Sequence, residues 1–405
     1  MTTTETPDIL PRILDYSSRA DPYPLYAELR KTPVALQEDG SYVVSTYREL
    51  TGILHNPHLS SDVRNLSRPM PGAEERATPS FINLDPPDHD RLRRLAMRPF
   101  GPPHTPGLVA GMEGDLTDIV SGLIDDFAGK QQIDIVDDFA YPFPVTVICH
   151  LLGVPREDEP RFHVWVNAII DSINYNPKTD PKEKLDNGIQ ATKNLRQYLG
   201  GLLEQRHGRP GDDLLTRLAN DDGPDGRMTD DEIVSTANLL LIAGHETTVN
   251  LITNGMLTLL RHPQVLQRLR GEPDLIVPLV EELLRYEPPV QIIPWRAAYS
   301  DIAVGDTVIP KGSQIMLMLA SGSRDPERFD HPDRFDPDRQ DNQHLGFGSG
   351  IHLCFGGPMA RLETQIALHE LVRRLDEPRL VVDPPPYRPS PVLRGPLHLH
   401  VEQNG

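Results

Sequence analysis

A glycine-rich segment in the last quarter of the chain carries one cysteine. It reads Phe347-Gly-Ser-Gly-Ile-His-Leu-Cys-Phe-Gly356 and precedes an apolar periodic run at 359–375, which predicts Cys354 at the start of a helix. Glycines at 348, 350, 356 and 357 permit a tight turn, and the positive end of a helix dipole lowers a thiol pKa. Such a thiolate can bind a metal, and thiolate ligation of haem iron favours O–O cleavage. The alternative is an ordinary packed thiol.

A second candidate is the polar cluster Ala243-Gly-His-Glu-Thr-Thr248, inside a long apolar pattern. Thr229-Asp-Asp-Glu232 fits a capping box and predicts that a helix begins at Thr229 and runs towards Leu260. A threonine hydroxyl that donates to the residue-243 carbonyl can open a kink in it. Glu246 and Thr247 offer an acid and a hydroxyl for proton delivery. The alternative is a kink with a solvated glutamate and histidine.

Two further segments carry paired charges at helical spacing. Glu282 and Arg285 are three residues apart in the helical stretch 275–286, and His89 and Arg93 are four apart. Taken alone, most such pairs are exposed salt bridges or helix starts with exposed charges.

Together the four segments resemble, in order, the signature motifs of the cytochrome P450 family. The resemblance implies haem b as the cofactor and Cys354 as the axial ligand of its iron, with Glu246 as the catalytic acid and Thr247 as the catalytic alcohol. It implies a buried structural network of Glu282, Arg285 and Arg334, the last from Pro332-Asp-Arg-Phe335. It also implies contacts to haem from a wider set: His89, Arg93, Ala243, Gly244, Arg296, Phe347, Gly348, His352 and Gly356. His352 departs from the pattern, because the family more often has arginine there.

The resemblance covers essentially the whole chain. It implies a mainly α fold, the cytochrome P450 helical prism with a small β-sheet region, in a single domain over residues 1–405. The helical periodicity between 110 and 285 agrees with this fold class, and short alternating stretches predict strands at 42–46 and within 302–309.

Composition limits the partners and the compartment. A net charge of −19 and a pI of about 5.2 argue against nucleic acid and anionic lipid as partners. The N-terminal residues 1–14 have no signal-peptide core, no apolar window approaches the roughly 20 residues needed to span a bilayer, and two cysteines suit a reducing compartment. We therefore expect a cytoplasmic monomer without membrane contact.

The resemblance also implies an activity. The expected activity is that of a monooxygenase, which uses dioxygen and two electrons from a separate ferredoxin and ferredoxin reductase. The expected substrate is an apolar small molecule, such as a terpenoid, macrolide, steroid or aromatic secondary metabolite. The alternatives are a peroxide-using variant, and a non-catalytic haem-binding sensor or recruitment module with the same fold.

Substrate and redox-partner contacts are expected from defined segments. The resemblance places the substrate pocket at 60–84, 161–185, 289–293 and 391–393, with Asn238 and Gln291 as polar anchors. A basic stripe of Arg91, Arg94 and Arg98 is a hypothetical docking surface for an acidic ferredoxin.

Overall fold

The computed structural model describes residues 9–68, 79–100, 108–127, 129–173, 181–223 and 226–404. Contacts between residues divide the chain into two compact units. Unit 1 combines the described residues up to 68 with Val277–Cys354 and Val382–His398, and unit 2 combines those from 79 to Ile276 with Phe355–Val381 and the segment that begins at Leu399. The single domain over residues 1–405 stays a prediction. The segments 69–78 and 174–180, which fall within the expected substrate pocket, lie outside the described residues.

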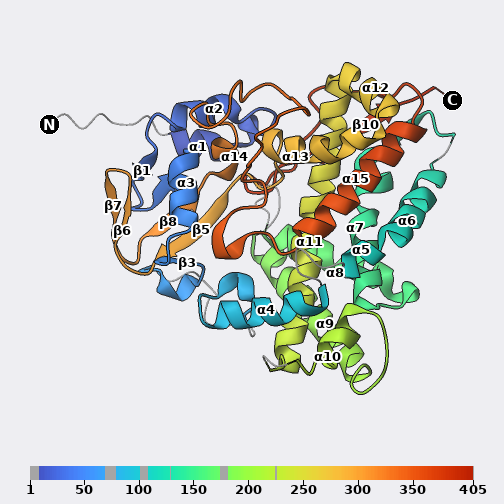
Figure 1. Cartoon of the computed structure of the whole chain (residues 1–405), viewed down its shortest axis with the longest axis horizontal. Coiled ribbons are helices and arrows are strands. Elements are labelled where there is room, and N and C mark those ends of the chain that lie inside the picture. The colour runs from blue at the N-terminus through green and yellow to red at the C-terminus, as the bar shows by residue number, and fades with distance from the viewer. Residues whose placement is uncertain are drawn as a thin grey trace. The chain divides into compact units, whose positions relative to one another are not determined.

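Unit 1 is built on a five-stranded sheet with the strand order β1-β2-β8-β5-β3 (Figure 1). Its strands are β1 (Val34–Leu36), β2 (Tyr42–Val44), β3 (Leu59–Ser60), β5 (Ile293–Ala298) and β8 (Gln314–Leu317), and β6 (Ile302–Val304) and β7 (Thr307–Ile309) form a separate hairpin. The helices are α1 (Ile9–Leu14), α2 (Tyr23–Leu29), α3 (Tyr47–Leu54), α13 (Ile276–Tyr286) and α14 (Leu319–Gly322). The strands predicted at 42–46 and within 302–309 are confirmed.

The sheet of unit 1 is held by an apolar core. Val44 of β2, Leu317 of β8 and Leu50 of α3 belong to one buried cluster, each with none of its surface exposed. Because parallel pairing of β2 with β8 places Val44 opposite Leu317, both side chains can pack beneath α3.

Unit 2 is almost entirely helical (Figure 1). Its helices are α4 (Asp88–Phe100), α5 (Leu108–Gly111), α6 (Glu113–Asp125), α7 (Pro142–Leu152), α8 (Glu159–Ile173), α9 (Pro181–Glu204), α10 (Leu214–Ala219), α11 (Asp230–Arg261), α12 (Pro263–Gly271) and α15 (Gly357–Arg374). The longest is α11, which packs against α7, α9 and α15. Thr229 is its N-cap, and the predicted capping box with Glu232 is present.

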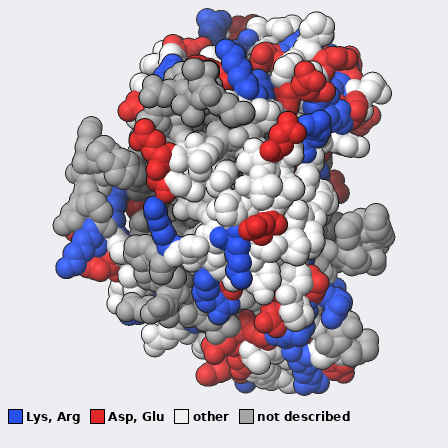
Figure 2. All heavy atoms as spheres, turned by 90° about the vertical axis from the view of Figure 1, so that its left-hand side faces the viewer, with Lys and Arg blue, Asp and Glu red and all other residues white. Residues whose placement is uncertain are grey.

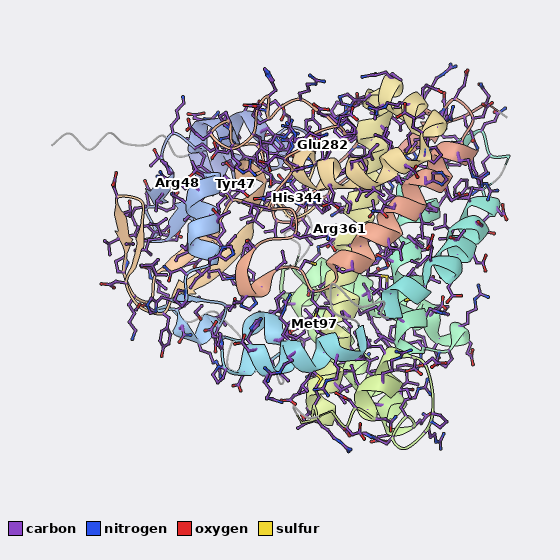
Figure 3. All side chains as sticks on the ribbon, viewed as in Figure 1. Tyr47, Arg48, Met97, Glu282, His344 and Arg361 are labelled. Carbon is purple, nitrogen blue, oxygen red and sulfur yellow. The ribbon has the colours of Figure 1, made fainter. Side chains whose placement is uncertain are left out.

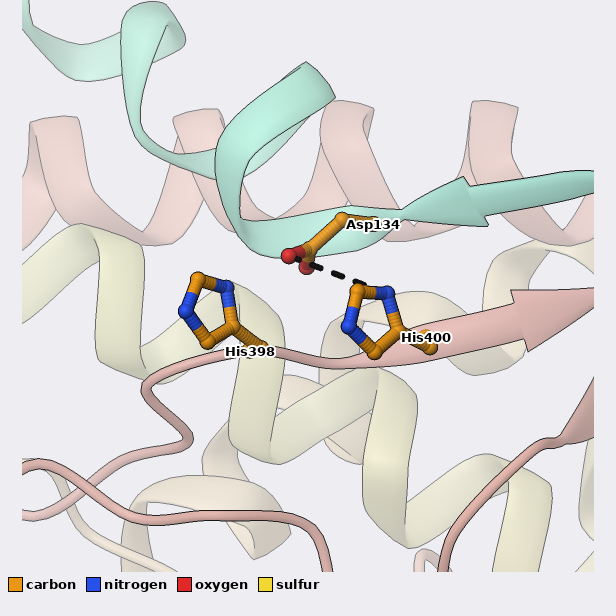
Figure 4. Close-up of side chains that lie close together, drawn as sticks. All are labelled: Asp134, His398 and His400. Carbon is orange, nitrogen blue, oxygen red and sulfur yellow. Dashed lines mark ion pairs between the residues drawn. The ribbon is translucent and has the colours of Figure 1, made fainter.

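A three-stranded sheet completes unit 2, with β10 (His400–Glu402) between β4 (Gln132–Asp134) and β9 (Arg379–Leu380). Asp134 stands opposite His400 in the register, and their side chains approach to 3.9 Å (Figure 4). The carboxylate of Asp134 also accepts the backbone N–H groups of Val136 and Leu399 at 3.0 and 2.9 Å. This side chain therefore stabilises the end of the sheet.

One stretch of helix corrects an expectation from the sequence. Residues Ile135–Leu152, with a mean hydropathy of 1.3, are long and apolar enough to cross a membrane, although no such window was expected. The stretch joins a π-helical segment, Ile135–Ala140, to α7, and 67% of it is buried. Burial in a protein core accounts for this composition.

Charged side chains are interspersed on the face of the molecule drawn in Figure 2, where neither sign forms one continuous patch among the described residues.

Candidate functional site

The cysteine loop of unit 1 lies against two helices. A Cβ atom on Gly346 would stand 2.5 Å from the carbonyl oxygen of Leu284 on α13, and one on Gly350 would stand 2.1 Å from that of Leu54 on α3. Gly350 also has φ of +72°, which disfavours any residue with a side chain. Only glycine at these two positions lets the loop pack as closely as it does. The loop then closes on itself, because the N–H of Cys354 donates to the carbonyl of Phe347 at 2.9 Å.

The two cysteines have opposite surroundings. Cys149 is buried in α7, and burial raises the pKa of its thiol, so it stays protonated. Cys354 is exposed and lies three residues before the first residue of α15. A thiolate-ligated cofactor needs a sulfur that it can reach, so the chemistry of the donor set fits haem at Cys354 and not at Cys149.

A histidine orders the start of the same loop. His344 accepts the N–H of Gly346 on its Nδ1 at 3.1 Å, and its Nε2 lies 3.2 Å from the carboxylate of Glu281 on α13. Figure 3 labels His344 together with Glu282, the neighbour of Glu281. Two predicted cofactor contacts also belong to unit 1: His352 is half-buried in a short 3₁₀ turn, and half-buried Arg296 on β5 donates to the carbonyl of Trp295 at 2.9 Å.

The pair Glu282 and Arg285 is fully buried in α13. Arg285 donates from Nε and Nη2 to the two carboxylate oxygens of Glu282, each at 2.7 Å. Its remaining N–H groups donate to carbonyls of the following segments, including those of Ser323 at 3.1 Å and Pro332 at 2.7 Å. The pair therefore holds the chain that leads to the cysteine loop.

The third member of this network differs from the prediction. The side chain of Arg334 is 70% exposed and lies 3.7 Å from Asp336, and only its carbonyl accepts from Arg285, at 3.1 Å. Arg339 takes the predicted place: its side chain is 10% exposed and its Nε lies 3.3 Å from Glu282. Arg334 was expected inside because it belongs to the recognised motif, whereas no local pattern singles out Arg339.

The stability of the protein should depend on Arg285 and hardly on Arg334. Replacing Arg285 by leucine leaves Glu282 buried without its main partner, which should lower the free energy of unfolding by about 3 kcal/mol or more. The matched control is Arg334→Leu, which removes an exposed side chain and should cost less than about 0.5 kcal/mol. Urea unfolding of the purified proteins measures both, and equal losses would contradict the assignment.

The polar cluster of α11 has the predicted internal hydrogen bond. The hydroxyl of Thr247 donates to the carbonyl of Ala243 at 2.6 Å. Residues 249–259 of this helix are buried throughout, whereas Leu239, Ala243 and Thr247, four residues apart, keep exposed surface. Because this spacing places them on one face, α11 presents an open strip that includes the threonine. A Cβ on Gly244 would stand 2.9 Å from Cδ1 of Ile148, so this glycine lies directly against α7.

The neighbouring ionisable residues are buried, which rules out the solvated alternative. Glu246 is 3% exposed and His245 is fully buried. The Nε2 of His245 lies 3.1 Å from the carbonyl of Tyr141, and its ring packs edge-on against the ring of Tyr141 at 4.6 Å between centroids. His245 therefore joins α11 to the segment before α7.

Glu363 is a buried acid that the sequence analysis missed. It lies on α15, is 3% exposed and accepts a hydrogen bond from Thr248 of α11 at 3.3 Å. Burial raises its pKa to about 8. A signal was present, because Glu363 is in helical register with Met359, Ala367 and Leu371, which are all buried.

The buried acid predicts a pH dependence. Between pH 4.5 and 8 the unfolded chain releases the Glu363 proton while the folded protein keeps it, so stability falls as pH rises through this window. Glu363→Gln should remove this contribution to the fall in the free energy of unfolding, which amounts to at most about 4 kcal/mol between pH 5 and pH 8. Denaturant unfolding at the two pH values measures it, with Glu204→Gln on exposed α9 surface as the control. The same pH slope in both variants would contradict the assignment.

Helix α4 carries His89 and Arg93, as predicted. His89 is 1% exposed, its Nδ1 lies 2.8 Å from Asp90, and Arg93 is half-buried. The basic stripe on this helix is less available than expected. Arg91 pairs with Glu232 at the start of α11, and Arg98 pairs with Asp221 at 2.7 Å. Two of its three arginines therefore tie α4 to other parts of unit 2.

Comparisons with known proteins agree with these features. The family model "Cytochrome P450" matches residues 68–399. The monooxygenase PikC of Streptomyces venezuelae is 38% identical over 97% of this chain and 94% of its own, and the vitamin D(3) 25-hydroxylase of Pseudonocardia autotrophica is 38% identical over 93% and 92%. The crystal structure of CYP164A2 from Mycobacterium smegmatis superimposes with a TM-score of 0.86 at 39% identity, covering 97% of this chain and 99% of that one.

These matches cover nearly the whole chain, and two of the relatives are named as a monooxygenase and a hydroxylase. The chain therefore belongs to the cytochrome P450 family of haem-containing monooxygenases.

Proposed function

We propose that this monooxygenase oxidises an apolar small molecule, with dioxygen as the oxidant and a ferredoxin and its reductase as the separate source of two electrons. The observation that carries the proposal is the exposed Cys354 at the end of a loop that glycines hold against α13 and α3. An exposed thiol in a preformed loop is the arrangement that a thiolate-ligated haem requires.

Residue roles follow from the chemistry of each side chain. Bound haem would supply the iron at which dioxygen is activated. Cys354 would bind that iron, and His89, Arg93, Arg296 and His352 would offer donors to the propionates. Ala243, Gly348 and Gly356, which carry little or no side chain, would leave room for a flat ligand beside the backbone. Phe347 is proposed as a further contact, whereas the Cβ side of Gly244 is filled by Ile148 of α7. Glu282 and Arg285 would retain haem indirectly, by holding the loop.

Proton delivery is the role proposed for Glu246 and Thr247. The Thr247 hydroxyl donates its hydrogen bond to the carbonyl of Ala243, so its oxygen can still accept one from another donor. Positioned acids and hydroxyls of this kind transfer protons in general acid–base catalysis. This pair argues against the peroxide-using variant, which would have no need of such a relay.

The substrate proposal is an apolar molecule of moderate size. A relative named for hydroxylating vitamin D(3) supports this class. Gln291 does not serve as a polar anchor for the substrate, because it is only 1% exposed and its side chain is already engaged. Its Oε1 accepts a hydrogen bond from Tyr26 at 3.0 Å, and its Nε2 donates to the carbonyl of Pro288 at 2.6 Å. Asn238 on α11 remains, since its buried Oδ1 has no hydrogen-bond partner among the described residues. We place the enzyme in the cytoplasm, as a monomer.

The test has two steps. The purified protein is first reduced and exposed to carbon monoxide, and the red-shifted Soret band of a thiolate–haem carbonyl is expected. It is then mixed with a ferredoxin, its reductase and apolar compounds that change the haem spin state. Consumption of reduced nicotinamide that depends on the compound, with oxidised product, supports the proposal. Haem binding without turnover of any compound would favour the sensor, and turnover with peroxide alone would favour the peroxide-using variant.

A further inference from the structure

A cluster of buried charges lies in unit 1, next to two segments expected to contact the substrate. Glu287 follows α13 directly and pairs with Arg394 from the C-terminal segment. Its carboxylate also lies 3.2 Å from Arg324, which follows α14. The side chains of Arg394, Arg324 and Glu287 are 3%, 6% and 14% exposed, so the cluster is shielded from water.

All three groups keep their charges despite burial. Burial alone would raise the pKa of Glu287, but Arg394 and Arg324 outweigh it and hold that pKa below its ordinary value. Burial would likewise lower the pKa of Arg394, but Glu287 outweighs it and the pKa is raised. The Arg324 guanidinium also lies over two aromatic rings, at 3.4 Å from the centroid of Tyr23 and 3.8 Å from that of Tyr286. The cluster is thus a stable group of ions inside the unit.

Arg394 joins this cluster to the N-terminal part of unit 1. Its Nε donates to the carbonyl of Arg19 at 2.7 Å, and its Nη2 donates to that of Ala20 at 2.8 Å. Arg19 in turn donates from Nε to the carbonyl of Pro389 at 3.3 Å. Both ends of the segment 389–394 are therefore attached to residues near the start of the chain.

The same segment pairs with the chain that follows Glu287. The N–H of Gln291 donates to Val392 at 2.9 Å and the N–H of Arg394 donates to Pro289 at 2.8 Å, so Val290 and Leu393 form an antiparallel bridge. The side chain of buried Gln291 accepts a hydrogen bond from the hydroxyl of Tyr26. The apolar side chains of Val290, Ile293, Val392 and Leu393, in contrast, are only half-buried. The paired segments therefore combine polar anchoring with apolar surface that stays accessible.

We propose that Arg394 and Glu287 are positioning residues that determine where Val290, Ile293, Val392 and Leu393 stand, and thereby which apolar molecules the enzyme accepts. The inference rests on the proposed function, because it takes the segments 289–293 and 391–393 as part of the substrate pocket. The ion cluster touches no substrate itself. It acts through the two segments whose backbones it joins to residues 19–26.

The test uses variants of the full-length haem protein. Arg394→Met removes the attachments to Arg19, Ala20 and Glu287, while Glu287 keeps Arg324 as a partner and is not left as a lone buried charge. Arg394→Lys keeps a cation beside Glu287 but loses the planar guanidinium group with its several N–H donors. It should therefore show only part of the change seen in Arg394→Met. The matched control is Arg30→Met, which removes a comparable bond from the end of α2 to the carbonyl of Ser321 at 3.0 Å but leaves the bonds of Arg394 in place.

Two measurements then decide the matter. Amide hydrogen exchange at positions 291 and 394 should become at least about tenfold faster in Arg394→Met, as expected for local loosening, and stay unchanged in Arg30→Met. Spectral titration compares econazole, a bulky azole, with imidazole, and the ratio of their dissociation constants should change about tenfold in Arg394→Met alone. Haem content and the carbon monoxide band should stay as in the unmodified protein.

Each contrary result has a separate meaning. Unchanged exchange at the two amides, or an unchanged azole ratio, overturns the positioning role. An equal effect of Arg30→Met shows general loosening of unit 1 and overturns it as well. If the unmodified protein binds no haem, the proposed function fails, and the inference fails with it.

Discussion

Cys354→His should abolish monooxygenase activity while leaving a protein that still binds haem. The imidazole offers a nitrogen ligand in place of sulfur, so the electron donation that favours O–O cleavage is lost. Product formation should fall on the order of 10³-fold or more, which corresponds to about 4 kcal/mol in the activation barrier. The band of the reduced carbon monoxide complex should move from the thiolate position to that of histidine-ligated haem. Cys354→Ser, with a weak oxygen ligand, should in addition lose haem.

The second cysteine provides the control. Cys149→Ala removes a thiol that is buried in α7 and protonated. It should leave the band and the product rate unchanged, apart from a small loss of stability from the cavity. A thiolate-type band that survives in Cys354→His would contradict the assignment of the ligand.

Thr247→Val should separate electron consumption from product formation. The substitution keeps the volume of the side chain but removes the hydroxyl that bonds to Ala243 and is proposed to relay protons. Reduced nicotinamide should still be consumed, but product should fall about 10²-fold, the size of a typical acid–base contribution. The electrons should instead appear in hydrogen peroxide, formed from dioxygen with two electrons and two protons. Glu246→Gln should slow the whole cycle and increase its solvent isotope effect.

Another threonine of α11, which is buried, serves as the control. The Thr253 hydroxyl donates to the carbonyl of Val249 at 2.9 Å, the same kind of bond within the same helix. Thr253→Val should leave the ratio of product to nicotinamide unchanged. If both variants uncouple alike, the effect comes from the helix backbone and not from a proton relay at Thr247.

Local signals in the sequence were sufficient for several features of the site. The capping box at Thr229 predicted where α11 begins, because its hydrogen bonds join residues only three apart. The bond from Thr247 to Ala243 was also predictable, since it spans one helical turn. The turn before Cys354 followed from its glycines, of which Gly348 and Gly350 have φ of +71° and +72°.

Features that depend on distant contacts were missed or wrong. Arg339 rather than the side chain of Arg334 reaches Glu282, Gln291 is engaged by Tyr26, and the arginine stripe of α4 is partly paired with acids far along the chain. None of these partners lies within a helical turn of the residue concerned. Residue type and spacing describe what a side chain is able to bind, but the packing of other segments decides which partner it meets.

The sequence by itself determined the family, the mainly α-helical fold, the haem cofactor and the residues whose chemistry suits it, because these are carried by motifs in which each residue lies close to the next. The tertiary structure alone decided burial and pairing. It placed Glu363 in the core with a raised pKa, enclosed His245 against Tyr141, and assembled Glu287, Arg324 and Arg394 from three separate segments. The physical reason is that desolvation and ion pairing depend on all the atoms around a charge, and most of those atoms come from residues remote in the sequence.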